Sequence, residues 1–193
     1  MNFRRIRMAL ARRNPFLKIG YAKCGKHSLI YKPLLIGKKS GIYLGNYVSF
    51  LDGARIDIID NWLNERYDSK VIIGNNTSFE QNCQITSAGI VKIGENCCFS
   101  ARVLITNLDH SYSKIGINVL KQEIVVRDVT IGNNCFFGMD SKVFSGVNIG
   151  DNVIVGANTI VTHNVPSNCV VVGCPGKIIK KYNFEKAKWE KYE

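Results

Sequence analysis

Acidic residues are absent from the first quarter of this 193-residue chain, in which the first one is Asp52. Eleven of the 26 basic residues lie in residues 1–39, and the remaining 15 balance the 15 acidic residues. The formal net charge of +11 therefore belongs to the N-terminal segment, and the rest of the chain is neutral. Such a segment suits an anionic membrane surface, a nucleic acid or a polyanionic substrate, and it equally suits a solvated helix packed on the protein.

Long apolar runs and paired cysteines are also missing. No apolar run reaches the roughly 18 residues of a membrane span, and the opening MNFRRIRMALARR has no apolar core of the kind found in secretory signals. We therefore expect a cytoplasmic protein. The seven cysteines are odd in number and form no C-x-x-C pair, which argues against a disulfide framework and against a zinc-binding motif. Reduced, structural thiols fit this pattern best.

What the sequence does contain is a six-residue repeat. Residues 131–166 divide into the hexads IGNNCF, FGMDSK, VFSGVN, IGDNVI, VGANTI and VTHNVP. The first position is aliphatic or Phe in every hexad, and the fifth position is small or β-branched. Earlier copies begin at Leu44, Ile73 and Ile93, and the text IGNN returns as IGDN eighteen residues later.

The nested periods of six and eighteen residues predict an all-β fold, a parallel β-helix of triangular coils. Six residues form a short strand and a corner, three such units close one coil, and stacked coils bury faces that no coil buries alone. An α-helical period of 3.6 residues would spread the apolar residues over the whole surface. Cys83, Cys97 and Cys135 fall at the fifth position, so we interpret them as small buried residues rather than metal ligands.

Both ends of the chain and two internal segments depart from the repeat. We predict a basic, helical N-terminal arm at 1–33, a β-helix domain at 34–176, and a tail at 177–193. The end of the tail, FEKAKWEKYE, is charged, and we expect it to form a helix that caps the open end of the stack. Within the β-helix, excursions from the coils are expected at 57–70 and 107–123.

The hexads, the string NVIVGANTIVTHNVPSNCVVVGCPGKIIKK and the loop that contains His110 resemble the hexapeptide-repeat acyltransferases over about residues 34–181. The chain is similar in particular to their branch of galactoside, maltose and lipopolysaccharide or capsule O-acetyltransferases. The resemblance implies a left-handed parallel β-helix, a homotrimer, and acetyl-CoA as co-substrate for acetylation of a sugar hydroxyl in surface polysaccharide or lipopolysaccharide biosynthesis. It implies no requirement for a metal and no nucleic-acid partner.

In that family a loop between two coils carries the catalytic histidine to a neighbouring subunit, and His110 is the residue that matches. A sugar hydroxyl is a poor nucleophile at neutral pH, and a neutral imidazole within hydrogen-bond reach takes its proton as it attacks the thioester carbonyl. We therefore expect His110 to act as general base in a direct transfer. The resemblance adds Asn82, Asp109 and Glu123 on the acceptor side, with a corner, a turn and a solvated charge as their structural alternatives. Asp109 is also a candidate to orient the His110 ring.

On the coenzyme side the family uses small residues and a Thr-Lys pair along the last coils, followed by basic residues for phosphates. The matching positions in this chain are Met139, Ala157, Thr162, His163 and Lys177. His163 replaces the usual lysine, and Met139 replaces a small residue. Lys177 has the alternative of a solvated basic residue in the tail.

The repeat by itself also fits functions other than acetyl transfer. A γ-class carbonic anhydrase needs three zinc-binding histidines per site, and the only histidines here, His27, His110 and His163, are scattered along the chain. N-acetylation of an amino sugar, O-acetylation of serine, and a non-catalytic β-helix that binds through its basic arm stay open. The arm also suggests a weak, peripheral contact with the inner leaflet of a membrane.

Overall fold

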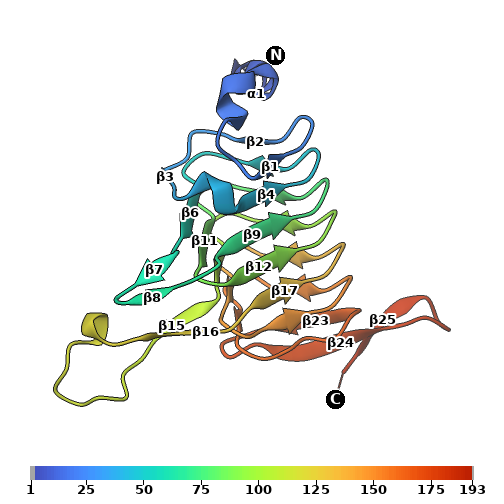
Figure 1. Cartoon of the computed structure of the whole chain (residues 1–193). Coiled ribbons are helices and arrows are strands. Elements are labelled where there is room, and N and C mark those ends of the chain that lie inside the picture. Colours follow the sequence, from blue (N-terminus) through green and yellow to red (C-terminus); the bar gives the residue numbers. More distant parts are fainter. Residues whose placement is uncertain (1–2, 193) are drawn as a thin grey trace.

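Short strands stacked in coils make up most of the structure, a computed structural model that describes residues 3–192 (Figure 1). Residues 1, 2 and 193, which belong to the predicted arm and tail, lie outside the described residues. Each coil contributes one strand to each of three sheets, and strands of neighbouring coils pair in parallel. The arrangement confirms the parallel β-helix predicted from the hexads.

Three parallel sheets form the sides of the stack. The first consists of β1 (Lys23–Cys24), β4 (Ile42–Leu44), β9 (Lys70–Ile73), β12 (Ile90–Ile93), β17 (Val129–Ile131) and β20 (Asn148–Ile149). The second consists of β2 (Leu29–Ile30), β5 (Ser49–Phe50), β10 (Ser78–Phe79), β13 (Cys98–Phe99), β18 (Phe136–Phe137), β21 (Ile154–Val155) and β23 (Cys169–Val172). The third consists of β3 (Leu35–Ile36), β6 (Arg55–Ile58), β11 (Gln84–Ser87), β14 (Leu104–Thr106), β19 (Lys142–Val143) and β22 (Ile160–Val161).

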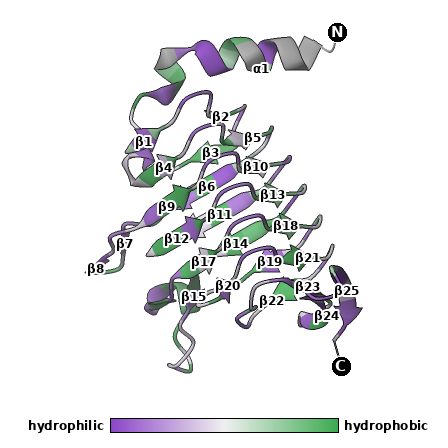
Figure 2. Ribbon diagram, turned by 90° about the vertical axis from the view of Figure 1, so that its right-hand side faces the viewer, coloured by the Kyte–Doolittle hydropathy of each residue, from purple (hydrophilic) through white to green (hydrophobic). Residues whose placement is uncertain are grey.

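The remaining elements lie at the ends of the stack or project from it. The helix α1 (Phe3–Arg13) lies across one end, as Figure 2 shows, and the 3₁₀ turn η1 (Pro15–Lys18) leads from it into the first coil. Two further 3₁₀ turns are η2 (Lys39–Gly41) and η3 (Val119–Lys121). Three antiparallel ribbons are β7 (Asn61–Trp62) with β8 (Glu65–Arg66), β15 (Leu108–His110) with β16 (Ile124–Val126), and β24 (Lys177–Asn183) with β25 (Lys188–Lys191).

Inward side chains of equivalent hexads stack directly above one another along the axis. In the second sheet Phe50, Phe79, Phe99 and Phe137 form a continuous column, with ring centroids 3.9, 4.4 and 4.5 Å apart. All four rings are at most 1% exposed. Because full burial of such a side chain stabilises a protein by about 1.5–3 kcal/mol, these columns carry much of the stability of the fold.

The fifth positions of the hexads face inward at the corners, as the repeat predicts. The thiols of Cys97 and Cys135 donate to the carbonyl oxygens of Gly132 and Gly150, each at 3.2 Å. Burial raises the pKa of Cys83 to about 11, which keeps this thiol neutral and unreactive at pH 7. These cysteines therefore act as small buried residues, in agreement with the sequence-based interpretation.

Asparagine recurs at the corners because the backbone there is left-handed. Asn76, Asn96, Asn134 and Asn152 occupy equivalent corners of successive coils, with φ between 56° and 57°. Asparagine tolerates this conformation better than other residues that carry a side chain, apart from aspartate. The last asparagine of the repeated sequence IGNN is therefore explained by the left-handed backbone conformation at this corner of the coil.

The stack begins earlier than the sequence suggested. Strands β1 and β2 pair in parallel with β4 and β5, so residues 23–33, assigned to the basic arm, form part of the first coil. Cys24, Ile30 and Ile36 keep the six-residue beat and pack against the core, but they are only partly buried. A terminal coil has a neighbour on one side only, so its inward residues are less completely buried. The predicted boundary at residue 34 missed this coil.

The predicted C-terminal capping helix is wrong. Residues 177–191 form an antiparallel hairpin in which β24 pairs with β23 and β25 pairs with β24. The edge strand β23 presents unpaired backbone groups, and pairing with β24 satisfies them where a helix would not. Tyr182 and Trp189 face each other across the hairpin with their ring centroids 5.3 Å apart. This tertiary pairing overrides the helical propensity of a Glu- and Lys-rich tail.

Candidate active site

The chain leaves the regular coil after β14 and forms a short antiparallel ribbon. Strand β15 pairs with β16, with His110 opposite Ile124, and the amide of Ser111 donates to the carbonyl oxygen of Glu123 at 2.9 Å. The irregular loop 111–123 extends beyond this ribbon, away from the stack (Figure 1). His110 therefore lies at the base of the loop, on a paired strand, and not at its exposed tip.

A buried asparagine fixes the point at which the ribbon departs. Asn107 is fully buried, and its side-chain oxygen accepts from the amide of Ala88 at 2.8 Å, in the coil below. Its carbonyl oxygen accepts from the amide of Arg127 at 2.9 Å, where the chain returns to the stack. One residue thus closes both ends of the excursion. Sequence reasoning did not single it out, because an asparagine beside a loop is common.

Gln122 holds the loop itself in one conformation. Its side chain is buried although the loop around it is exposed, and it bonds three backbone groups of the opposite strand of the loop. It accepts from the amide of Lys114 at 3.0 Å, and it donates to the carbonyl oxygens of Lys114 at 3.1 Å and Ile117 at 3.0 Å. A 13-residue segment without sheet partners is thereby ordered from within.

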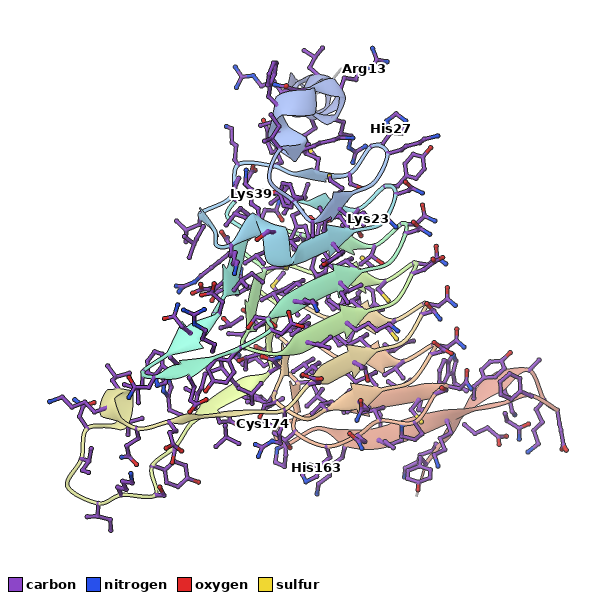
Figure 3. The ribbon with its side chains drawn as sticks, in the orientation of Figure 1. Arg13, Lys23, His27, Lys39, His163 and Cys174 are labelled. Carbon is purple, nitrogen blue, oxygen red and sulfur yellow. The ribbon has the colours of Figure 1, made fainter. Side chains whose placement is uncertain are left out.

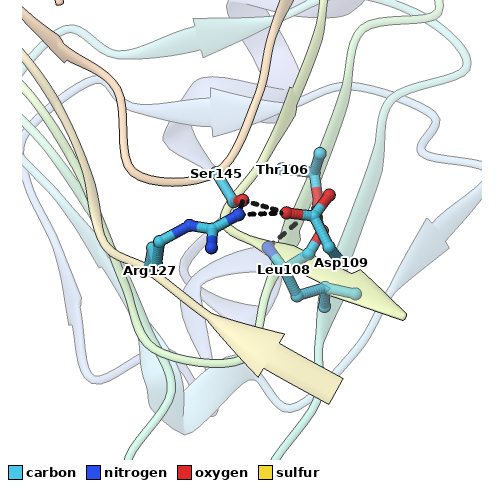
Figure 4. A network of polar contacts seen from close by, with 5 residues as sticks. All are labelled: Thr106, Leu108, Asp109, Arg127 and Ser145. Atoms are coloured by element: carbon cyan, nitrogen blue, oxygen red, sulfur yellow. Dashed lines mark hydrogen bonds and ion pairs between the residues drawn. The ribbon is translucent and has the colours of Figure 1, made fainter. Parts of the chain in front are cut away.

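The side chain of Asp109 forms its hydrogen bonds with residues of the coil that follows the loop. Its Oδ2 accepts from Arg127 Nη2 at 2.7 Å and from the hydroxyl of Ser145, as Figure 4 shows. Successive side chains of a strand point to opposite faces, so Asp109 and His110 point apart. The described bonds of Asp109 therefore tie the ribbon to the next coil, and the predicted role of Asp109 in orienting the His110 ring has no contact to support it.

His110 lies in the wall of a hollow of about 530 Å³ at the base of the loop. Its ring is half-buried, and its Nδ1 is fully buried with no hydrogen-bond partner among the described residues. The ring packs against Trp62, with centroids 5.0 Å apart and ring planes at 63°. The other lining residues are Asp109, Ser111, Tyr112, Ser113, Val125 and Arg127.

Trp62 reaches His110 from a different excursion, the hairpin β7–β8. Its indole Nε1 donates to the carbonyl oxygen of Gln122 at 2.8 Å, so the hairpin contacts both the histidine and the loop. Sequence reasoning recognised the segment 57–70 as an excursion but assigned no role to any residue in it. The available signal was the presence of one of the chain's two tryptophans in a segment that breaks the repeat.

The other predicted acceptor residues take different positions. Glu123 is exposed at the end of the loop, next to the strand that pairs with His110. Asn82 occupies the corner between β10 and β11 with φ 59°, and its amide donates to the carbonyl oxygen of Asp52. Asn82 therefore has the geometry of a corner asparagine, which was the structural alternative to a role in acceptor binding. Within one chain the structure therefore brings Asp109, His110 and Glu123 onto one ribbon and leaves Asn82 on the coil.

The residues predicted for the coenzyme lie on the last two coils and the tail. Met139 and Ala157 occupy the same corner of successive coils, linked by the amide of Asn158, which donates to the Met139 carbonyl oxygen at 2.8 Å. Both are exposed. The Thr162 hydroxyl and His163 Nδ1 lie 2.9 Å apart at the following corner. Figure 3 places His163 at the end of the stack opposite to Arg13.

Lys177 begins β24 opposite Val172, close to that same end of the stack. Its strand is attached to the last coil through Gly176, whose amide donates to the carbonyl oxygen of Ile160 at 2.8 Å. The five predicted coenzyme residues are thus surface positions on neighbouring coils and on the strand that follows them. An extended, thin ligand is able to run across such a surface along exposed backbone groups.

The described residues form neither a metal site nor a membrane-spanning helix. Among residues 3–192, no three side chains of His, Cys, Asp or Glu converge to hold a metal ion. His27 and His163 lie at opposite ends of the stack in Figure 3, which does not suit a shared zinc site. Within the same residues, none of the helices has the length and apolar character required to cross a bilayer.

Comparison with known proteins agrees with this architecture. The family described as "Hexapeptide repeat of succinyl-transferase" matches residues 128–163. The putative lipopolysaccharide biosynthesis O-acetyl transferase WbbJ of Escherichia coli K12 is 29% identical over 181 residues, which cover 90% of this chain and 87% of that protein. Galactoside O-acetyltransferase of the same organism is 33% identical over 121 residues, but the match spans only 57% of its length and 61% of this chain.

Solved structures share the fold at low sequence identity. AntD, an N-acyltransferase from Bacillus cereus, superposes with a TM-score of 0.73 at 20% identity, covering 90% of this chain and 91% of that one. A maltose O-acetyltransferase from Clostridium difficile gives a TM-score of 0.62 at 22% identity, covering 92% and 83%. The repeat, the stack of coils and these relatives make the chain similar to the hexapeptide-repeat acyltransferases, and its fold is their left-handed parallel β-helix. The sequence relatives named here are a putative lipopolysaccharide O-acetyl transferase and a galactoside O-acetyltransferase.

Proposed function

We propose that the protein is an acetyl-CoA-dependent O-acetyltransferase that acts on a sugar hydroxyl in surface polysaccharide or lipopolysaccharide biosynthesis. The observation that carries the proposal is the position of His110. The residue lies on a ribbon outside the coils and is half-buried in the wall of a hollow. The similarity to a putative lipopolysaccharide O-acetyl transferase along nearly the whole chain supports the acceptor class.

His110 acts as general base in a direct transfer. Its Nδ1 is buried against the protein, which leaves Nε2 as the nitrogen to meet a substrate. As the sugar oxygen attacks the thioester carbonyl carbon, Nε2 takes the hydroxyl proton and the carbonyl oxygen becomes an oxyanion. The tetrahedral intermediate then collapses, the C–S bond breaks, and the imidazolium returns its proton to the coenzyme A thiolate.

The coenzyme lies along the last coils in this proposal. The exposed corners at Met139 and Ala157 offer backbone groups to the amides of a pantetheine arm, and Lys177 offers a positive charge to its phosphates. Phe136, with 44% of its surface exposed, supplies an apolar wall beside them. Co-crystals with coenzyme A test this placement directly.

The active form is a homotrimer. Several apolar side chains project from the His110 loop into solvent, among them Ile115 at 99% and Tyr112 at 82% exposure. Such a surface is expected to be covered, and the flat sheets of a β-helix pack well against copies of themselves. Light scattering on the purified protein tests the assembly, and a fully active monomer contradicts it.

The protein works in the cytoplasm and touches the inner membrane leaflet weakly through its basic end. The first coil and its approach contain Lys18, Lys23, Lys32, Lys38 and Lys39. Figure 3 shows Lys23 and Lys39 toward the end of the stack that α1 covers. Near an anionic surface each basic residue contributes on the order of 1 kcal/mol. Salt-sensitive co-sedimentation with anionic but not neutral vesicles, lost on deletion of residues 1–13, tests the contact. If the protein does not co-sediment with anionic vesicles even at low salt, the membrane contact is ruled out and α1 serves only as a cap of the stack.

The reaction is tested by release of the coenzyme A thiol from acetyl-CoA across a panel of acceptors. Galactosides and glucosides test O-acetylation of sugars, amino sugars test N-acetylation, and free serine tests the third acyl acceptor. We expect acceptor-dependent release with a neutral sugar, and release slower by about 10²-fold or more after His110→Ala. Release with an amino sugar or serine alone moves the activity to that class, and no release with any acceptor favours a binding protein.

A further inference from the structure

Among the residues that the structure describes, His110 has no partner of the kind that usually orients a catalytic base. In nucleophile–base arrangements the second ring nitrogen is normally held by a carboxylate or a carbonyl oxygen, which fixes the ring and its tautomer. Here Nδ1 is buried without a hydrogen-bond partner among the described residues. The neighbouring carboxylate, Asp109, is bonded to Arg127 and Ser145 instead. The orientation of the imidazole must therefore come from packing.

The packing partner is Trp62. The two rings meet edge to face with centroids 5.0 Å apart, which lies within the preferred range for aromatic pairs. Trp62 is itself held by its indole N–H, which donates to the Gln122 carbonyl oxygen at 2.8 Å. An indole fixed in this way restricts rotation of the imidazole much as a hydrogen bond does.

The hairpin that carries Trp62 is anchored at its base. Lys38 Nζ lies 2.7 Å from Asp60 Oδ2, and the hydroxyl of Ser69 donates to the carbonyl oxygen of Ile59. The backbone also closes the hairpin at its base, since the amide of Tyr67 donates to the carbonyl oxygen of Asp60 at 2.9 Å. Trp62 is thus presented by a fixed element of the second coil, and not by a free loop.

We propose that Trp62 is a positioning residue for His110, an aromatic support that replaces the hydrogen-bonded partner of the second ring nitrogen. The inference rests on the proposed function of His110 as general base. It assigns to the hairpin β7–β8 a role in catalysis although the hairpin and the histidine belong to excursions two coils apart.

Kinetics separate positioning from a merely structural role. We expect Trp62→Ala to lower kcat on the order of tenfold or more, with KM for acetyl-CoA within about twofold, and Trp62→Phe to restore most of the loss. In a His110→Ala background the second change, Trp62→Ala, should cost nothing further. Trp189→Phe, the other tryptophan, on β25, is the matched control and should leave kcat unchanged. An unaltered kcat in Trp62→Ala, or an equal fall in both backgrounds, overturns the proposal.

A spectroscopic test needs no turnover. In the Trp189→Phe protein Trp62 is the only tryptophan, so the emission reports on the surroundings of this indole alone. We expect His110→Ala in that protein to shift the emission maximum, because the indole loses the ring that packs against it. An emission maximum that does not change in His110→Ala overturns the contact. His110→Ala turnover by itself tests the proposed function, so the two failures are distinguishable.

Discussion

The coils and the two excursions of this protein are built in different ways. A coil repeats one pattern, an inward apolar residue and a corner with a left-handed asparagine, and each unit is supported by its copies above and below. The hairpin β7–β8 and the His110 ribbon have no copies, and individual side chains hold them. These are Asn107, Gln122 and Arg127, with Trp62 between the two excursions. Stability is therefore distributed along the stack, whereas the chemistry depends on a few bonds outside it.

The largest expected effect lies in the coils. Phe99 is fully buried in the middle of the aromatic column, with ring neighbours on both sides. Phe99→Ala should lower the free energy of unfolding by about 3–5 kcal/mol, because it removes buried surface and leaves a cavity that the neighbouring rings cannot fill. Chemical denaturation measures this loss. Protein that remains folded should keep its specific turnover, and a fall in kcat at low denaturant would show that coils and site are coupled.

The opposite pattern is expected for His110→Ala. We expect turnover to fall by about 10²-fold or more, because the hydroxyl proton then has no acceptor. The unfolding midpoint should change little, since the ring is only half-buried and its Nδ1 makes no hydrogen bond within the described residues. Thiol release and denaturation of the same sample give both numbers. Near-normal turnover would contradict the role of His110 as general base. A large loss of stability would show that the excursion, and not only the coils, contributes to the stability of the fold.

A smaller effect is expected where an excursion is tied to the stack. Arg127→Met removes the bond to Asp109 but keeps the aliphatic stem of the side chain. Because both partners are substantially exposed, stability should change by less than about 1 kcal/mol, while kcat falls on the order of tenfold as the ribbon loosens. Arg55→Met is the matched control, since Arg55 pairs with Asp57 on the coil at 2.9 Å. Equal kinetic effects of the two changes would remove any special role of the ribbon bond.

The same division explains what was predictable from the sequence. The coils were predictable because an apolar residue at every sixth position marks the side chains that point into the stack. The predictions for the two ends were wrong because this pattern is weaker there. Cys24 keeps the beat of the first coil without an aliphatic residue, and the hairpin at β24 forms because β23 offers an open edge, which is a tertiary fact.

The site was predictable only where it breaks the repeat. The loss of the beat drew attention to His110, and the resemblance to a known family gave it a role. Trp62 and Gln122 act through contacts between segments 60 residues apart in sequence, and no periodicity records such contacts. Asp109 shows the opposite error. Its place beside His110 in the sequence suggested that the two side chains touch, but successive side chains of a strand point to opposite faces, and Asp109 bonds to Arg127 instead.

The smallest expected effect concerns the corners. Asn96 adopts φ 56°, a left-handed conformation that a β-carbon disfavours and that asparagine tolerates. Asn96→Ala should cost about 1 kcal/mol of stability, whereas Asn96→Gly should stay within about 0.5 kcal/mol, because glycine adopts this conformation freely but adds flexibility to the unfolded chain. Both variants lose the side-chain bond from Asn76 at 3.2 Å, so the difference between them isolates the backbone strain. Neither should alter kcat, since the corner belongs to the coil. Equal stability of the two variants would mean that the repeated asparagines serve their ladder of side-chain bonds rather than the left-handed turn.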